Sequence, residues 1–159
     1  MRGCSFTGHR TIKKEHEGRL AGLLFRAINY AYERGCRTFY SGGAVGFDTY
    51  AACEVISFRI THPSVRLIML LPCIDQDKMW SPAQRDTYQY LLSSADETVY
   101  VSEEYTPTCM RERNRLLVEN CDMLIAYMSS PRSGTGQTVS MAKRSSREIY
   151  NLYPALERK

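Results

Sequence analysis

The chain has 159 residues, of which 43% are hydrophobic and 24% charged, as in an ordinary globular protein, so we expect residues 1–159 to form a single domain. No apolar run approaches the roughly 18 residues of a membrane helix, and no long apolar segment opens the chain. We therefore expect no membrane association and a cytoplasmic location. The net charge of +4 mildly favours anionic partners. Nucleic acid is a possible partner on this charge, but the charge does not favour it over other anions.

The six cysteines contain no C-x-x-C pair, and the chain has only three histidines. The spacing typical of a zinc site is therefore missing, so the sequence predicts no metal site and points to no cofactor. Most of the cysteines lie within or beside apolar runs, where a free thiol behaves as a small hydrophobic side chain. This pattern is typical of a protein whose cysteines stay reduced.

Short apolar runs alternate with helical patterns along the chain. The runs predict strands at residues 3–7, 37–40, 65–71, 97–101, 123–128 and 149–152. The patterns predict helices at residues 15–34, 47–59, 83–92, 109–120 and 137–145. Pro72 is expected to stop the third strand, and Ser81 is expected to cap the third helix, with Pro82 in its first turn.

This alternation predicts an α/β fold with a mainly parallel sheet that is covered on both faces. Ligands bind such sheets outside the carboxyl ends of the strands. Four loops that follow strands, at residues 7–10, 41–48, 72–80 and 129–136, would then gather at one edge of the sheet. Their convergence predicts the position of a binding site.

The loop at residues 41–48 reads Ser-Gly-Gly-Ala-Val-Gly-Phe-Asp and joins a strand to a helix. Such a turn lets backbone N–H groups approach a phosphate. No Lys follows the last glycine and the spacing differs from G-x-G-x-x-G, which excludes a triphosphate P-loop and a Rossmann dinucleotide motif. Asp48 is expected to cap the helix, with contact to a ribose hydroxyl as the alternative. The candidate binding residues here are Ser41, Gly42, Gly43, Gly46 and Asp48.

Two further segments carry candidate binding residues. In the loop at residues 7–10, Gly8 permits a tight turn, Arg10 suits phosphate oxygens, and His9 can donate a hydrogen bond or transfer a proton. The alternative is an ordinary exposed turn. Arg111, Arg113 and Arg115 lie near the start of the helix predicted at residues 109–120, where cations are unfavourable next to the helix dipole unless an anion lies near. The alternative there is a solvated charged helix.

The segment at residues 133–138 reads Ser-Gly-Thr-Gly-Gln-Thr and again lies between an apolar strand and a helix. Hydroxyl and backbone N–H groups would converge there, as a phosphate site requires. Its candidate binding residues are Gly134, Thr135, Gly136 and Thr138. Two such turns in one small chain predict a site for a nucleotide or a related phosphate ester.

These motifs together resemble the SLOG superfamily, named after Smf/DprA and the Lonely Guy proteins, and within it the YpsA-type proteins. The resemblance is carried by Phe-Thr-Gly-His-Arg at residues 6–10, the 41–48 loop, Met110-x-x-Arg113-Asn114 and Gly134-Thr135-Gly136-x-x-Val139. It implies a Rossmann-like, three-layer α/β/α fold. It also implies a nucleotide or nucleotide-derived ligand, with Asn114 among the binding residues. Because the two phosphate-type loops, Arg10 and Arg113 come without a complete acid/base pair, the first hypothesis is a binding protein that acts as a sensor or sequesters a nucleotide.

Lonely Guy enzymes hydrolyse the N-glycosidic bond of modified adenosine monophosphates, and the resemblance places their catalytic Arg at Arg113. Their motif P-G-G-x-G-T-x-x-E supplies a Glu, and that position falls on Ser140, which cannot replace a carboxylate. Asp48, Asp75 or Asp77 would have to substitute. A phosphoribohydrolase is therefore the alternative to a binding protein, and a DprA-like binder of single-stranded DNA is the third. The Lonely Guy resemblance also implies a homodimer.

Overall fold

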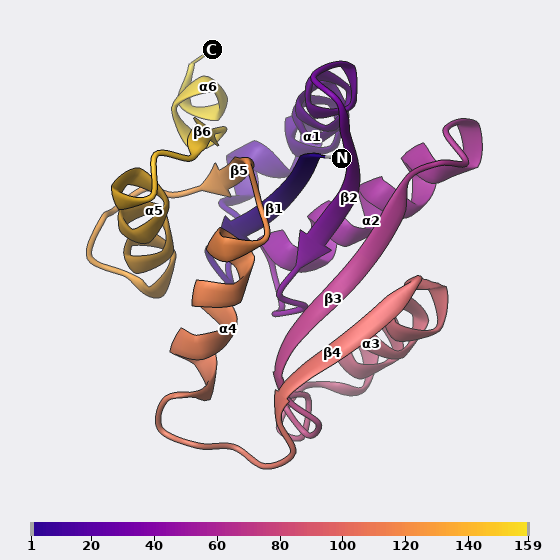
Figure 1. Cartoon of the computed structure of the whole chain (residues 1–159), viewed down its shortest axis with the longest axis vertical. Helices are drawn as coiled ribbons and strands as arrows, with labels where there is room; N and C mark the ends of the chain where they lie inside the picture. Colours follow the sequence, from indigo (N-terminus) through magenta and orange to yellow (C-terminus); the bar gives the residue numbers. More distant parts are fainter. Residues whose placement is uncertain (1, 159) are drawn as a thin grey trace.

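The computed structural model describes residues 2–158, and these contain one six-stranded sheet (Figure 1). The strands are β1 (Arg2–Gly8), β2 (Cys36–Ser41), β3 (Arg66–Cys73), β4 (Glu97–Ser102), β5 (Met123–Tyr127) and β6 (Glu148–Asn151). The helices are α1 (Glu17–Glu33), α2 (Phe47–Thr61), α3 (Pro82–Ser94), α4 (Cys109–Glu119), α5 (Gly134–Arg144) and α6 (Tyr153–Glu157), and a short 3-10 turn (Lys14–His16) precedes α1. The predicted alternation of strands and helices is confirmed.

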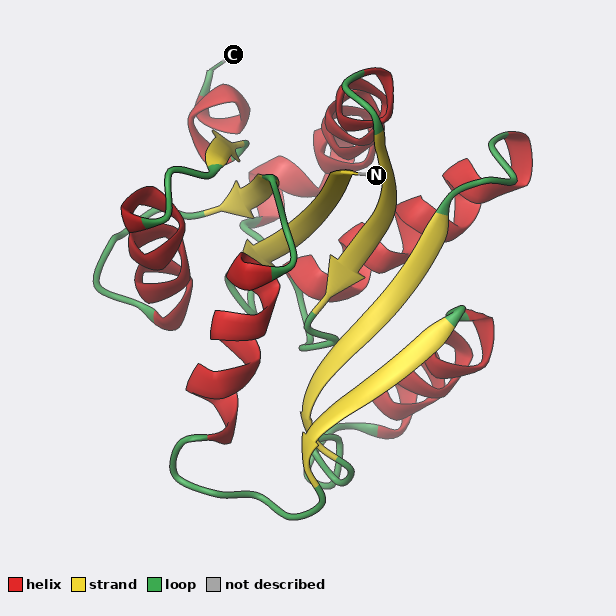
Figure 2. Ribbon diagram, in the orientation of Figure 1, coloured by secondary structure: helices red, strands yellow, loops and turns green. Residues whose placement is uncertain are grey.

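The strand order is β4-β3-β2-β1-β5-β6, and every neighbouring pair is parallel. Helices α1, α2 and α3 lie on one face of the sheet, and α4 and α5 lie on the other, which confirms the three-layer α/β/α fold (Figure 2). The chain runs outward from β1 to β4 and then returns through α4 to β5 on the other side of β1. Ligands of open parallel sheets bind at such a reversal of strand order.

The centre of the sheet is fully covered. The middle residues of β1 and all of β5 are buried, because helices pack on both of their faces. All six cysteines are free thiols, and five of them are buried. No helix within residues 2–158 is long and apolar enough to cross a membrane. Across the same residues, no group of three or more ligating side chains is placed to hold a metal ion.

Two predictions about β3 and α3 have different outcomes. The prediction that Pro72 stops the strand is wrong, because β3 continues through it to Cys73. Strand β2 pairs with β3 only as far as Met69, so β3 has a neighbour on one side alone at Pro72, where proline is tolerated. The cap of α3 is confirmed: Ser81 Oγ accepts a hydrogen bond from the Gln84 backbone N–H, and Gln84 Oε1 accepts one from the Ser81 backbone N–H.

Helix α5 begins three residues earlier than predicted. Its N-cap is Ser133, whose Oγ accepts a hydrogen bond from the Gly136 N–H at 2.9 Å. Because the two glycines belong to the first turn of this helix, their low helix propensity misled the prediction of its start. Helix α6, which was not predicted, packs Leu156 into the core.

Candidate functional site

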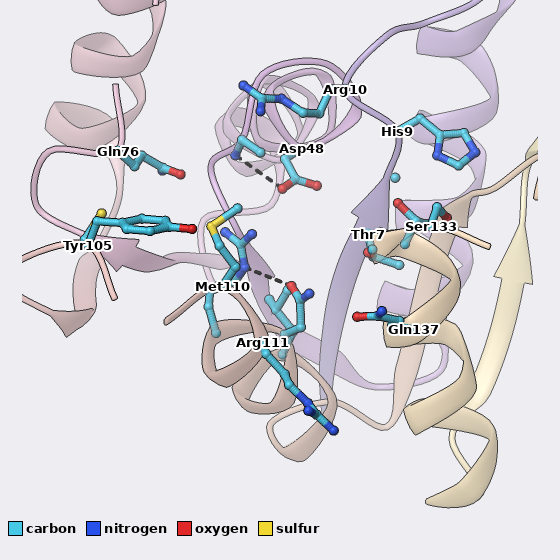
Figure 3. Close-up of a pocket in the computed structure, with 18 of the residues that line it drawn as sticks. Thr7, His9, Arg10, Asp48, Gln76, Tyr105, Met110, Arg111, Ser133 and Gln137 are labelled. Atoms are coloured by element: carbon cyan, nitrogen blue, oxygen red, sulfur yellow. Dashed lines mark hydrogen bonds between the residues drawn. The ribbon is translucent and has the colours of Figure 1, made fainter. Parts of the chain in front are cut away.

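A cavity of about 1150 Å³ opens at the carboxyl ends of the central strands (Figure 3). Its walls come from the loops after β1, β2 and β3, from the segment around the start of α4, and from the start of α5. The four loops that were predicted to gather at one sheet edge therefore do so. The volume slightly exceeds the usual range of about 300–1,000 Å³ for small-molecule sites.

The structure divides the predicted binding residues into two groups. Those that line the cavity are Gly8, His9, Arg10, Asp48, Arg113, Asn114, Gly134 and Thr135. Those that lie outside its lining are Ser41, Gly42, Gly43, Gly46, Gly136 and Thr138. Lining residues that were not predicted as binding residues include Thr7, Met110, Ser133 and Gln137, which lie within the quoted motifs, and Gln76 and Lys78, which do not.

Backbone N–H groups of the 41–48 loop are already occupied by the protein itself. The Gly43 N–H donates to Ser41 Oγ at 3.2 Å, and the Ala44 N–H donates to Asp48 Oδ2 at 3.2 Å. The first N–H of α2 donates to a carbonyl of the loop after β1. The contribution of this loop to the cavity is therefore the side chain of Asp48 more than an open cradle of N–H groups.

The prediction that Asp48 caps α2 is wrong, because the N-cap is Gly46 and no side chain caps the helix. Gly46 has a φ of 89°, a left-handed conformation that favours glycine, and a Cβ there would overlap the Arg10 carbonyl. Asp48 lies within the first turn instead, and its Oδ2 reaches back to the Ala44 N–H. This hydrogen bond from the Ala44 N–H holds the 41–48 loop in place, and it does not cap the helix.

Asp48 is only 6% exposed, and its buried carboxyl group lies in the wall of the cavity. Burial raises its pKa to about 6, against the opposing effects of the Arg113 charge and the hydrogen bond from Ala44. Its second oxygen, Oδ1, is sealed from solvent and has no hydrogen-bond partner among the described residues.

Arg113, on α4, is 4% exposed and is held in one orientation. Its Nη1 donates to the Gly42 carbonyl at 2.5 Å, and its Nε donates to Asn114 Oδ1 at 2.9 Å. Burial lowers the pKa of the guanidinium, while the nearby Asp48 raises it. The site therefore contains a buried cation whose position is set before any ligand arrives.

The start of α5 offers free donors to the cavity. Ser133 satisfies two of the first N–H groups of the helix, through its Oγ and its carbonyl. The N–H groups of Gly134 and Thr135, which line the cavity, have no partner within residues 2–158. A Cβ built on Gly134 would meet no atom within 4 Å, so the space beside it is open. Unpaired N–H groups at a helix start attract anions.

His9 connects the two central loops. Its Nε2 accepts a hydrogen bond from the Ser129 backbone N–H at 2.8 Å, so the neutral ring carries its proton on Nδ1. Desolvation lowers the pKa of His9, which favours the same neutral form. Its role in this structure is to fix the start of the loop between β5 and α5.

Side chains from different elements line opposite sides of the cavity. Figure 3 shows Gln76 and Tyr105 on one side and Ser133 on the other, with Asp48 lying between them. Tyr105, which is 68% exposed, points its ring into the cavity beside Met110 (Figure 3). An exposed aromatic ring at the edge of a cavity provides a surface on which a planar group can stack.

Tyr105 precedes α4 in a segment without a recognisable motif. Trp80 also lines the cavity, but it packs edge-on against Tyr88, with ring centroids 5.0 Å apart. Trp80 is therefore partly committed to packing, whereas Tyr105 is more exposed to the cavity.

The carboxylates near the site differ in their surroundings. Ser140 is exposed on α5 and lies outside the cavity lining. When the Gly-Thr pair of the Lonely Guy motif is aligned with Gly134 and Thr135 at the start of α5, the Glu of that motif falls on Thr138 instead of Ser140. Neither residue is acidic. Asp77 pairs with an arginine of α3 and lies outside the cavity lining, and Asp75 is exposed. Asp48 is the buried carboxylate that the cavity wall contains.

Comparison with known proteins places the chain in a family. The model of the YpsA family, described as "YspA SLOG family", matches residues 12–154. A prophage-derived protein of Bacillus subtilis, YoqJ, is 29% identical over 130 residues, covering 73% of this chain and 76% of that protein. That relative is described as uncharacterized.

Two solved structures share the fold, both of DNA processing protein A. The chain matches the Streptococcus pneumoniae protein with a TM-score of 0.65 and 18% identity, over 93% of this chain and 52% of that one. It matches the Helicobacter pylori protein, whose structure concerns its single-stranded DNA binding, with a TM-score of 0.66 and 18% identity, over 93% and 63%. The chain thus spans less than two thirds of either protein. The family match over residues 12–154 shows that the chain belongs to the YpsA family of the SLOG superfamily.

Proposed function

We propose that this protein binds a nucleotide or a nucleotide-derived small molecule in the cavity, with a phosphate at the start of α5. The observation that carries the proposal is the pair of N–H groups of Gly134 and Thr135, which have no partner within residues 2–158 and belong to residues that line the cavity, with open space beside Gly134. Because the site lies at the reversal of strand order, its position also agrees with that of ligands in other open parallel sheets.

The charges around the cavity favour an anionic ligand. Four basic side chains and two acidic side chains line it, and Arg111 points away from Asp48 in Figure 3. One of the four basic side chains, Arg113, is a cation that two hydrogen bonds hold in place. A preorganised arginine loses little side-chain entropy on binding, which supports recognition of a phosphate ester.

Calorimetry with a panel of mono-, di- and cyclic nucleotides tests the proposal. We expect saturable binding of at least one nucleotide with one site per chain, and at least tenfold weaker binding by Gly134→Ala, whose methyl group would occupy the open space beside the donors. Binding without any reaction would agree with a sensor or sequestering protein. A folded protein that binds no nucleotide of the panel would refute the proposal.

Hydrolysis of a nucleoside monophosphate is a second candidate, and Asp48 is the observation that favours it. A buried carboxyl with a pKa of about 6 is suited to proton transfer near neutral pH, and Arg113 lies close to it. Chromatographic detection of free base tests this candidate. Release of base that persists unchanged in Asp48→Asn would argue against the role of Asp48.

Single-stranded DNA binding has weaker support from the described residues. Tyr127 is fully buried and stacks on Phe47 at 5.7 Å, and Tyr32 is covered by Arg37 at 3.7 Å, so these rings serve packing. A gel-shift assay at two salt concentrations separates this alternative from a small-molecule site. Tight, salt-sensitive binding of an oligonucleotide in preference to mononucleotides would favour it.

A further inference from the structure

Two buried polar side-chain atoms among the described residues lack a hydrogen-bond partner, and they differ in their surroundings. His16 Nε2 lies 3.3 Å from Glu157 Oε2, so it has an electrostatic partner despite its poor hydrogen-bond geometry. Asp48 Oδ1 has none. Buried oxygens of carboxylates are normally hydrogen-bonded, because an unsatisfied one is costly in free energy. Asp48 Oδ1 is therefore an exception that requires an explanation.

The neighbouring cation does not satisfy this oxygen. Arg113 directs Nη1 to the Gly42 carbonyl and Nε to Asn114, and no ion pair within 4.0 Å joins it to Asp48 in the part of the chain that the structure describes. The other oxygen, Oδ2, is already held by the Ala44 N–H. The carboxylate is thus held on one side and left without a hydrogen-bond partner on the other, and its residue lines the cavity.

The place of Asp48 in the cavity indicates which donor would meet it. The anion site at the start of α5 lies on one side, and Tyr105 lies on the other (Figure 3). In a nucleotide the sugar connects the phosphate to the base. A ligand with its phosphate at Gly134 and its base at Tyr105 therefore brings its sugar to Asp48, and the hydrogen-bond donors of a ribose are its hydroxyl groups.

Resting on the nucleotide-binding function proposed above, we infer that Asp48 Oδ1 accepts a hydrogen bond from a ribose hydroxyl, so that the site selects ribonucleotides over their deoxy counterparts. A site built around a buried acceptor rejects a ligand that lacks the matching donor, because the acceptor then stays unsatisfied. The same reasoning explains why a carboxylate is kept in a position where burial opposes its charge.

The experiment compares ribonucleotides with deoxynucleotides in calorimetry. AMP, GMP, CMP and UMP are titrated first, and the strongest binder is then compared with its 2′-deoxy and 3′-deoxy forms. We expect the wild-type protein to bind at least one deoxy form at least tenfold more weakly. Asp48→Asn, which preserves the shape of the side chain, is expected to reduce that ratio to threefold or less.

Asp86→Asn is the matched control, because Asp86 is an exposed aspartate on α3 that lies outside the cavity lining. Its selectivity should equal that of the wild type, and circular dichroism verifies that each variant is folded. If the wild type binds ribo and both deoxy forms equally, or if Asp48→Asn keeps the full selectivity, the inference about Asp48 is refuted while nucleotide binding stands. If no nucleotide binds the folded wild type, the proposed function itself fails.

Discussion

Arg113 on α4 donates a hydrogen bond of 2.5 Å to the carbonyl oxygen of Gly42, which directly follows β2 and lies 71 positions earlier in the chain. A Cβ built on Gly42 would lie 2.7 Å from Arg113 Nη1, so the glycine leaves room for the guanidinium. This contact joins a helix on one face of the sheet to the loop that carries Asp48. The same hydrogen bond therefore holds the buried guanidinium of Arg113 against the loop that carries the buried carboxyl group of Asp48.

Replacing Arg113 should destabilise the protein strongly. Arg113→Met removes a buried cation, leaves the Gly42 carbonyl without its donor and deprives Asp48 of the charge that favours its ionised form, so we expect a loss of about 3–5 kcal/mol in the free energy of unfolding. Urea denaturation at neutral pH measures it. Arg115→Met is the control, because Arg115 is largely exposed, and it should change stability by less than about 0.5 kcal/mol. Equal effects of the two variants would contradict this account of Arg113.

The two glycines at the start of α5 should behave differently. A Cβ on Gly136 would overlap the Pro131 backbone, so Gly136→Ala should lower stability by about 1–3 kcal/mol. Gly134→Ala meets no neighbour and should leave stability unchanged or slightly raised, while weakening nucleotide binding. Thermal denaturation combined with calorimetry distinguishes the two effects. A loss of stability in Gly134→Ala as large as in Gly136→Ala would be inconsistent with an open space beside Gly134.

Asp48 should make stability depend on pH in a direction opposite to that of most carboxylates. Its folded pKa of about 6 exceeds the ordinary value of 3.8, so the folded chain holds this proton more tightly than the unfolded chain. The resulting stability is fully present below pH 3.8 and is lost as pH rises through about 6. Relative to Asp48→Asn, the wild type should lose about 2 kcal/mol between pH 4 and pH 7. Parallel stability curves for the two proteins would show that Asp48 is not perturbed by burial.

His9 should act on stability in the opposite direction. Its folded pKa is lowered from the ordinary value of 6.5, so its contribution is present above pH 6.5 and is lost as pH falls through the lowered folded value. Protonation of Nε2 would also remove the acceptor of the Ser129 N–H. Nitrogen-15 NMR of the ring at pH 7.5 should show the proton on Nδ1. A proton on Nε2 would contradict the hydrogen bond to Ser129.

Local chemistry in the sequence predicts much of this fold. Alternating apolar runs and helical patterns predict the three layers, because each buried strand and amphipathic helix must cover the other. The Ser81 cap follows from its own residues and those of α3. The prediction at Pro72 fails for a reason outside the local sequence, since the end of its pairing with β2 depends on where a distant strand stops.

The candidate site is predictable only in part. The loops can be placed from the strands that they follow, but not which of their N–H groups the protein itself consumes. Glycines at Gly43 and Gly134 look alike in sequence, yet the N–H of the first donates to Ser41 and that of the second is free in the described structure. The contact of Arg113 with Gly42 bridges 71 positions, so no local pattern reveals it.

The most direct test of the central claim is amide NMR of the protein with the tightest-binding nucleotide of the panel. We expect the largest chemical-shift changes at the N–H groups of Gly134 and Thr135, because those donors would meet the phosphate. Gly18 and Gly22, whose surroundings on α1 are open but which do not line the cavity, serve as the internal reference and should not move. Saturable binding that leaves Gly134 and Thr135 unchanged, or no binding by any nucleotide, would contradict the account.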